Sequence, residues 1–171
     1  MTRKQADIVH IAGHLHDIGK IGIPDTVLQK PGALSPAEWN LIREHPAIGS
    51  IILEPIEIFA AKHGVRDMVL THHERFDGSG YPSGLAGNSI PLGGRILAIA
   101  DSVAAMLESR TYRIPMTFEE AIGEIERGAG RLYDPTLCRD FLLHVADARR
   151  LVEHNTLRVQ RADQSVWATA S

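Results

Sequence analysis

Two short segments of this chain carry the sequence pattern of a helix N-terminus, and they constrain the fold more than any other feature. Ser35-Pro36-Ala37-Glu38 and Thr117-Phe118-Glu119-Glu120 each place a hydroxyl side chain three residues before a glutamate, the arrangement of a capping box. Pro91 and the pair Asp134-Pro135 are further helix starts. No run of alternating apolar and polar residues is long enough to predict a sheet. The sequence therefore predicts an all-α fold.

The spacing of apolar residues places the expected helices. They run over about 4–18, 36–45, 66–74 and 135–152, with a further helix that begins after Pro91 and buries Ile96, Ile99, Val103, Met106 and Leu107. Trp39, Leu41 and Ile42 are expected to pack their helix against the core. Residues 153–171 show no periodicity, so we expect one domain over residues 1–152 and a C-terminal tail over 153–171.

Composition excludes several classes of protein. At 171 residues and 44% hydrophobic content, the chain is long enough for one domain with a real core. A net charge of −3 favours neither duplex nucleic acid nor an anionic membrane as a partner. The single Cys138 excludes an intrachain disulfide and a thiolate metal cluster. Because neither a membrane-spanning apolar run nor a signal peptide is apparent, we expect a cytoplasmic protein.

Histidine and aspartate supply the candidate metal ligands. Six residues offer nitrogen or oxygen ligands: His16, Asp17, His45, His72, His73 and Asp101. A mixture of imidazoles and carboxylates suits a pair of transition metals such as iron or manganese, which activate water for attack on a phosphate ester. A lone His-Asp pair is more often a capping or surface pair, so the prediction depends on the whole set.

A helical wheel shows how the first of these residues can share one site. At about 100° per residue, Asp17 lies about 100° from His16, and Lys20 lies about 40° from it, between the two. His16 would then bind one metal, the carboxylate of Asp17 would bridge two, and Lys20 would meet a phosphate oxygen. The adjacent His72 and His73 diverge in the same way, so each is expected to serve a different metal.

The loop that follows the histidine pair is rich in glycine. Its glycines permit positive φ and close approach of the backbone, so we expect it to form a lip of the substrate site, with the residues Asp77, Gly78, Gly80, Tyr81 and Pro82. Glu74, beside the histidine pair, either orients a metal ligand or caps this loop.

The ordered motifs of the chain resemble those of one family. They are the His16-to-Pro24 run, Lys30-Pro31-Gly32, Arg43-Glu44-His45-Pro46, the His72-to-Pro82 run, Ile90-Pro91-Leu92, Ala98-to-Asp101, Arg110-to-Arg113 and Tyr133-Asp134-Pro135. Together, from Leu15 to about Leu143, they resemble the HD-GYP family, the bacterial branch of the HD metal-dependent phosphohydrolases. The resemblance implies an HD-like helical bundle that takes part in signal transduction.

The resemblance also implies an activity. Cyclic di-GMP would be hydrolysed to pGpG, and family members often continue to GMP. The attacking group would be a hydroxide that bridges divalent metal ions, of which the site would hold two or three. The six ligands above fall on the family's metal ligands, and Lys20, Arg110 and Arg113 fall on positions that hold the dinucleotide. Tyr81 would either stack on guanine or pack the turn. A diguanylate cyclase (GGDEF) domain and a sensory or receiver protein are the implied partners.

Three features depart from the family pattern. Only fifteen residues precede His16, so we expect the N-terminal helices of the family, which carry a further metal ligand, to be missing. His10 or His14 could take the place of that ligand; the alternative is that both pack or lie in solvent at the start of the first helix. Ala104 stands where the family has a second aspartate. Gly94 stands where alanine is common, and glycine there lowers helix stability. The alternatives are therefore a weakened domain that only binds the dinucleotide or a GGDEF partner, and a phosphohydrolase of another nucleotide.

Overall fold

Helices make up the regular structure of the residues that the computed structural model describes, 1–108 and 114–154. Their order is α1 (Arg3–Leu15), η1 (Ile18–Gly22), α2 (Asp25–Leu28), α3 (Pro36–Ile42), α4 (His45–Leu53), η2 (Glu57–Phe59), α5 (Val65–Thr71), η3 (Gly87–Ser89), α6 (Leu92–Leu107), α7 (Phe118–Gly128) and α8 (Pro135–Leu143). No β-strand occurs in these two ranges, where only the isolated bridges Asp77–Ala86 and Ala129–Tyr133 form. The prediction of an all-α fold is confirmed.

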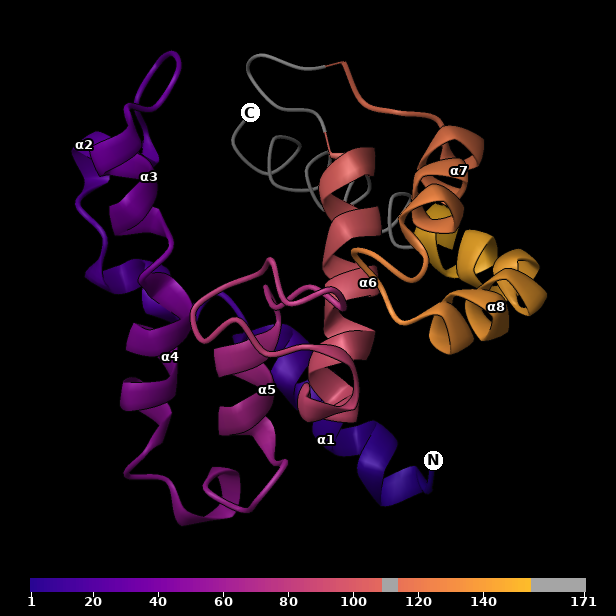
Figure 1. Ribbon diagram of the computed structural model, residues 1–171, viewed down its shortest axis with the longest axis horizontal. Helices are drawn as coiled ribbons and strands as arrows, with labels where there is room; N and C mark the ends of the chain where they lie inside the picture. Colours follow the sequence, from indigo (N-terminus) through magenta and orange to yellow (C-terminus); the bar gives the residue numbers. More distant parts are fainter. Residues whose placement is uncertain (109–113, 155–171) are drawn as a thin grey trace, which may run out of the picture. The chain divides into compact units, whose positions relative to one another are not determined.

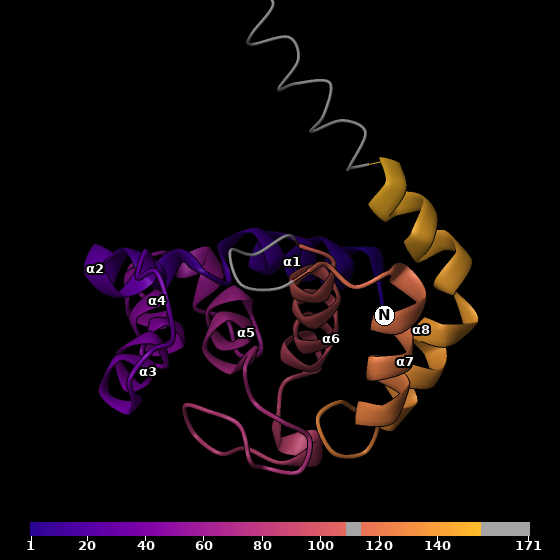
Figure 2. The ribbon, with the colours of Figure 1, turned by 90° about the horizontal axis from the view of Figure 1, so that it is seen from above.

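The described chain divides into two compact units, Met1–Cys138 and Arg139–Ser171. In the first unit, α4, α5 and α6 follow one another in a row and α1 runs across α5 and α6 (Figures 1 and 2). Their buried side chains form the core, which consists of Ala12, Leu53, Val65, Met68, Val69 and Leu97. In the second unit, helical residues continue from 145 to 154 after a turn at His144. No helix in the described ranges combines the length and apolar character needed to cross a membrane.

The predicted helix starts are confirmed. Ser35 and Thr117 each accept a hydrogen bond from the backbone N–H of the glutamate three residues on, and that glutamate accepts one in return. Asp134 Oδ1 accepts from the backbone N–H of Thr136 at 2.8 Å, so it caps α8 as expected. These bonds satisfy backbone donors that have no partner within the helix.

The first helix is shorter than predicted. It ends at Leu15, and Asp17 adopts φ −97° and ψ 5° before the 3-10 helix η1. The reason is a close approach to α4: a Cβ atom added to Gly19 would lie 1.9 Å from the carbonyl oxygen of His45. A continued α-helix could not keep that contact, so the chain turns out of α1 and packs η1 against α4.

Candidate metal centre

All six predicted metal ligands lie together in the first unit. His45 Nε2 is 3.3 Å from His72 Nε2, and the ligand atoms of His45, His72 and His73 all lie within 4.8 Å of one another. The ring centroids of His16 and His72 are 5.2 Å apart. The two carboxylates complete the group, which we call the metal floor: His16, Asp17, His45, His72, His73 and Asp101.

Asp17 lies between two of the histidines. Its Oδ1 atom is 3.3 Å from His45 Nε2, and its Oδ2 atom is 3.3 Å from His16 Nε2. Asp101 Oδ1 is 3.5 Å from the same nitrogen of His16. Lys20 Nζ donates to Asp17 Oδ2 at 2.5 Å. The two oxygens of one carboxylate therefore face two different imidazoles, and a cation stands beside one of them.

Three of the imidazoles are oriented in the same way. The Nδ1 atoms of His16, His45 and His72 each donate to the backbone carbonyl oxygen three residues earlier, at 2.7 Å. These carbonyls, of Gly13, Ile42 and Val69, lie in the last turns of α1, α3 and α5, where they have no partner within the helix. A carbonyl only accepts, so each Nδ1 carries the proton and each Nε2 faces the floor as a potential metal ligand.

Burial keeps most of these imidazoles neutral. It lowers the pKa of His72 to about 3 and that of His73 to about 4, and it lowers the pKa of His45 as well. Neutral imidazole is the form that binds a metal. The Nε2 lone pairs of His45 and His72 then meet at 3.3 Å, an arrangement that a shared cation stabilises.

Unlike the other imidazoles, His16 favours its charged form, and so do the two carboxylates. Hydrogen bonds to Asp101 and then to Asp17 raise the pKa of His16 to about 10. Burial opposes ionisation of both carboxylates and is the largest single influence on each. The hydrogen bond from His16, together with Lys20 at Asp17 and with the nearby imidazoles at Asp101, outweighs it, so the pKa of each carboxyl lies below its usual value. The protein groups alone therefore hold a proton at His16, and an ion bound there has to displace it.

Glycine contacts bring the ligand-bearing helices together. A Cβ atom on Gly49 of α4 would lie 2.9 Å from Val69 of α5, and one on Gly94 of α6 would lie 2.4 Å from Thr71 Oγ1, next to His72. From the sequence alone, Gly94 indicates only a loss of helix propensity. The structure gives it a packing role, because it lets α6 and Asp101 approach the end of α5.

The metal floor lies in a cleft of about 1220 Å³. Lys20 and Tyr81, both predicted to contact substrate, line this cleft. The other loop residues predicted to do so, Asp77, Gly78, Gly80 and Pro82, are not among the lining residues. Their substrate role stays a prediction, as does that of Arg110 and Arg113, which lie outside the described residues.

The glycine-rich loop is held by hydrogen bonds to Glu74. Glu74 is buried, and its two carboxylate oxygens accept from the backbone N–H groups of Ser83 at 2.7 Å and Leu85 at 3.1 Å. A Cβ atom on Gly80 would lie 2.5 Å from Glu74 Cα, so that position requires glycine. Of the two roles considered for Glu74, the structure assigns the capping of the loop.

Tyr81 reaches back to the floor from this loop. Its ring stacks on His73, with centroids 4.9 Å apart and an interplanar angle of 29°. The guanidinium carbon of Arg43 lies 5.5 Å from the centroid of the Tyr81 ring. The sequence analysis gave Arg43 no role, because no local pattern shows that the end of α3 meets the loop.

The prediction that Trp39 packs against the core is wrong. Its side chain is 49% exposed and lines the cleft. His10 and His14 also lie apart from the floor: both are exposed on α1, and their Nε2 atoms contact each other at 3.2 Å. Neither lines the cleft, and the structure therefore does not support either as a metal ligand of the floor.

The fold and the site can now be compared with known proteins. A model of the HD domain family matches residues 1–137. The chain belongs to the HD domain family. This HD domain is 48% identical over 134 residues to a cyclic di-GMP phosphodiesterase of Thermotoga maritima, covering 78% of this chain and 36% of the relative. The resemblance to the HD-GYP branch is confirmed by such relatives.

Other relatives extend the comparison. The cyclic di-GMP phosphodiesterase response regulator RpfG of Xanthomonas campestris is 43% identical over 143 residues, covering 84% of this chain and 37% of the relative. The 3'3'-cGAMP-specific phosphodiesterase 2 of Vibrio cholerae is 39% identical over 144 residues, covering 84% of this chain and 27% of the relative. The HD domain thus spans between 27% and 37% of the length of these three curated relatives.

A solved structure supports the fold of this HD domain. A cyclic GMP-AMP specific phosphodiesterase from Vibrio cholerae matches 90% of this chain and 39% of that chain with a TM-score of 0.56. The sequence identity is 18%, so this likeness concerns the fold alone.

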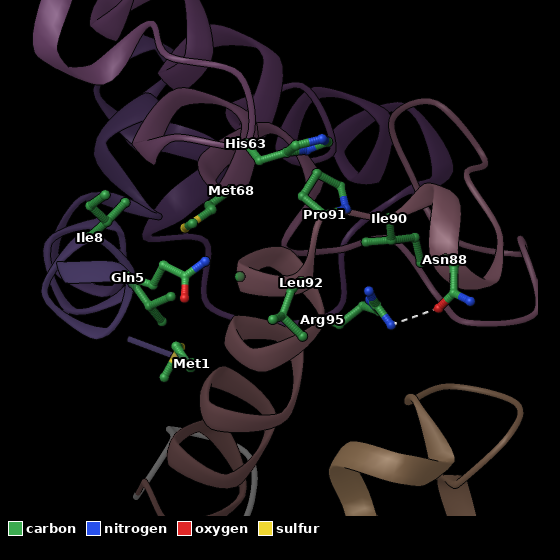
Figure 3. A pocket seen from close by; sticks show the side chains of 12 residues that line it. Met1, Gln5, Ile8, His63, Met68, Asn88, Ile90, Pro91, Leu92 and Arg95 are labelled. Atoms are coloured by element: carbon green, nitrogen blue, oxygen red, sulfur yellow. Dashed lines mark hydrogen bonds between the residues drawn. The ribbon is translucent and has the colours of Figure 1, made fainter. Parts of the chain in front are cut away.

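A second pocket of the HD domain lies apart from the metal floor (Figure 3). It encloses about 340 Å³ between the start of α1 and the start of α6, and Gln5, Met68 and Leu92 are among its lining residues. Arg95, at its edge, donates to Asn88 and to Asp134. None of the predicted site residues lines this pocket.

Proposed function

We propose that this HD domain is the catalytic part of a metal-dependent phosphodiesterase that opens cyclic di-GMP to pGpG and continues to GMP. The observation that carries the proposal is the position of Asp17, whose two oxygens face His45 and His16 on opposite sides. A carboxylate in this position suits a bridge between two metal ions. The printed names of the relatives, which act on cyclic di-GMP or 3'3'-cGAMP, support the substrate class.

The residues of the metal floor would hold the ions. Iron or manganese fits a set of four imidazoles and two carboxylates. When bound, the ions supply Lewis-acid stabilisation of the phosphoryl oxygens and a water that is acidic enough to ionise near neutral pH. The chain's own part is to hold the ligands in place: the carbonyls of Gly13, Ile42 and Val69 fix three rings before any substrate arrives.

Lys20 would supply charge stabilisation that does not depend on a metal. Its ammonium group lies 2.5 Å from Asp17 Oδ2 and lines the cleft. A phosphodiester bound at ions held by Asp17 would therefore place an anionic oxygen within reach of a fixed positive charge. In this assignment Asp17 and Lys20 are the catalytic residues, and Lys20 also binds substrate.

A domain that binds without turnover is the alternative, and Ala104 is the residue in the cleft that favours it. Ala104 lines the cleft one helical turn after Asp101. Its methyl group cannot accept a hydrogen bond, so one polar contact near the metals is lost. The six residues of the metal floor nevertheless lie together, and this favours turnover over binding alone.

The activity test uses anaerobically purified protein loaded with iron or manganese. We expect cyclic di-GMP to be converted to pGpG and GMP, followed by chromatography, and chelation to abolish the conversion. Asp17→Ala should lower the rate by about 100-fold or more. Asp7→Ala, which removes an exposed carboxylate from α1 outside the cleft, is the matched control. Equal rates for the wild type and Asp17→Ala would refute the bridging role.

We further infer that this output domain works with a GGDEF or receiver partner. The support is that the relative RpfG carries the name of a response regulator and that this chain spans 37% of it. Co-purification with a diguanylate cyclase, lost when Asp77 and Ser79 in the loop are replaced, would support the partner. An unchanged yield would exclude the loop as its docking site.

A further inference from the structure

The outer wall of the cleft on the α3 side carries an exposed indole. Trp39 lines the cleft together with the apolar residues Leu28, Leu34 and Pro36. Its side chain is 49% exposed, and it does not belong to the core cluster. A tryptophan needed only for packing would be largely buried, so this indole offers a face to whatever enters the cleft.

A free guanidinium lies one helical turn beyond the indole. Arg43 follows Trp39 by four residues, the spacing at which side chains on a helix are neighbours. Within the described residues it has no ion pair, and its recorded side-chain contact is with the ring of Tyr81, which stacks on His73 of the floor. Side-chain contacts thus lead from His73 of the floor through Tyr81 to Arg43, and Trp39 lies one helical turn before Arg43 in α3.

The helix that carries this wall is fixed in place. Lys30 Nζ donates to both carboxylate oxygens of Glu38, at 2.9 and 2.7 Å, and this pairing lowers the pKa of Glu38 to about 2. Glu38 also closes the capping box with Ser35. Because α3 is anchored at its start next to Trp39, the indole is held at a defined position on the cleft wall.

We propose that Trp39 and Arg43, the α3 wall, form the subsite for one guanine base of the dinucleotide. The indole would stack on the face of the base, and the planar guanidinium would donate to the O6 and N7 atoms of guanine. A cleft of about 1220 Å³ leaves room for a base on this wall while the phosphodiester lies on the metal floor. The inference rests on the proposed function, because it takes a cyclic dinucleotide as the ligand.

A fluorescence experiment tests the stacking without depending on turnover. The chain has two tryptophans, Trp39 and Trp167, so Trp167→Phe leaves Trp39 as the sole indole. Stopped-flow mixing of this metal-loaded variant with cyclic di-GMP should quench the indole emission in a saturable way. Binding measured by equilibrium dialysis without any change in emission would overturn the subsite.

Kinetics with two substrates separate base binding from a general structural effect. Trp39→Ala should raise the KM for cyclic di-GMP about 10-fold and leave turnover of bis(p-nitrophenyl) phosphate, which has no base, unchanged. Trp39→Phe should restore most of the loss. Leu41→Ala, on the same helix but outside the cleft lining, should change neither substrate. An equal loss on both substrates for Trp39→Ala would refute the proposal.

Arg43 is tested by base preference. Arg43→Ala should weaken binding of cyclic di-GMP about 10-fold and weaken binding of cyclic di-AMP much less, because adenine keeps the N7 acceptor but has an amino group in place of O6. Equal weakening of both ligands would exclude the contact to guanine.

The outcomes distinguish this inference from the proposed function. Saturable quenching of Trp39 without hydrolysis of either substrate would keep the guanine subsite and refute the phosphodiesterase. Hydrolysis of cyclic di-GMP with unaltered KM in Trp39→Ala would keep the phosphodiesterase and refute the subsite. Absence of both quenching and hydrolysis would refute both.

Discussion

The metal floor and the α3 wall of the same cleft are built in opposite ways. On the floor, His45 and His72 are each 1% exposed, and a backbone carbonyl fixes each ring. On the wall, Trp39 is 49% exposed, and the exposed Arg43 contacts the ring of Tyr81 with its guanidinium group. In the proposed function this difference separates two tasks: the rigid floor would serve any phosphodiester, whereas the open wall would discriminate between bases.

The largest effect is expected from breaking the floor. His72→Ala removes a buried imidazole whose Nε2 atom lies 3.3 Å from His45 Nε2 and which is a proposed metal ligand. Turnover of cyclic di-GMP and of bis(p-nitrophenyl) phosphate should both fall by about 100-fold or more, in contrast to the one-substrate effect of Trp39→Ala. His14→Ala, an exposed histidine on α1, is the control. A loss confined to cyclic di-GMP would contradict the division between floor and wall.

The next effect concerns the backbone under the floor. Gly19→Ala would place a Cβ atom 1.9 Å from the carbonyl oxygen of His45, so η1 has to move away from α4 and take Asp17 with it. We expect a loss of roughly 3 kcal/mol in the free energy of unfolding, measured by urea denaturation, and a parallel loss of metal affinity. Gly13→Ala, whose Cβ would make an ordinary contact at 3.5 Å with Leu97, should cost far less. Similar values for the two variants would show that the close approach is not needed.

A pH titration sharpens the comparison, because only the floor carries a displaceable proton. Asp101 and Asp17 raise the pKa of His16 from 6.5 to about 10, so in metal-free protein the ring is charged at neutral pH. Metal affinity should therefore rise with pH, by about tenfold per unit below pH 10, as one proton is released. The pairing itself stabilises the metal-free fold fully below pH 6.5 and is lost as pH rises through about 10.

Calorimetry in buffers of different ionisation enthalpy measures this proton directly at pH 7.5. The wild type should release one proton on metal binding, and His16→Gln should release none. Trp39→Ala should behave as the wild type. An affinity for manganese that stays constant between pH 7 and 9 would contradict the assignment of the proton to His16.

The smallest effect is expected at Gly94. Helix propensity predicts that Gly94→Ala stabilises α6 by about 1 kcal/mol. The added Cβ atom would, however, lie only 2.4 Å from Thr71 Oγ1, and this close contact predicts a loss of stability. We expect packing to win, with a net loss of about 1 kcal/mol in the free energy of unfolding. Gly123→Ala in α7 is the matched control, because its Cβ would meet only the flexible end of Arg127. A gain at both positions would mean that α6 does not depend on close contact with α5.

Local patterns predicted the helix starts and the metal ligands. A capping box is a contact within four residues, so Ser35 and Thr117 could be assigned from the chain alone. The set of His and Asp ligands was predicted from residue chemistry and from the family resemblance, and the six side chains do converge. The local structure around Asp17 differs from the prediction. Asp17 lies in a turn between α1 and η1, and the single helix predicted to run through it does not form.

Long-range packing decided the features that the sequence could not predict. The apolar pattern around Trp39 is the same whether the indole faces a core or a cleft, and only the position of α3 beside the floor decides between them. The same holds for Glu74, whose partners lie nine and eleven residues further along the loop. Arg43 meets Tyr81 across 38 positions of sequence, a contact that no local periodicity encodes.

In the proposed function the buried imidazoles and the two carboxylates form one centre for two divalent ions. The most direct test is the metal content of anaerobically purified, iron- or manganese-loaded protein after desalting, for the wild type, His45→Ala and the control His14→Ala. The account predicts two ions per chain in the wild type and in the control, and fewer than one in His45→Ala. A wild type that retains no ion, or a His45→Ala variant that retains as many as the wild type, would contradict it.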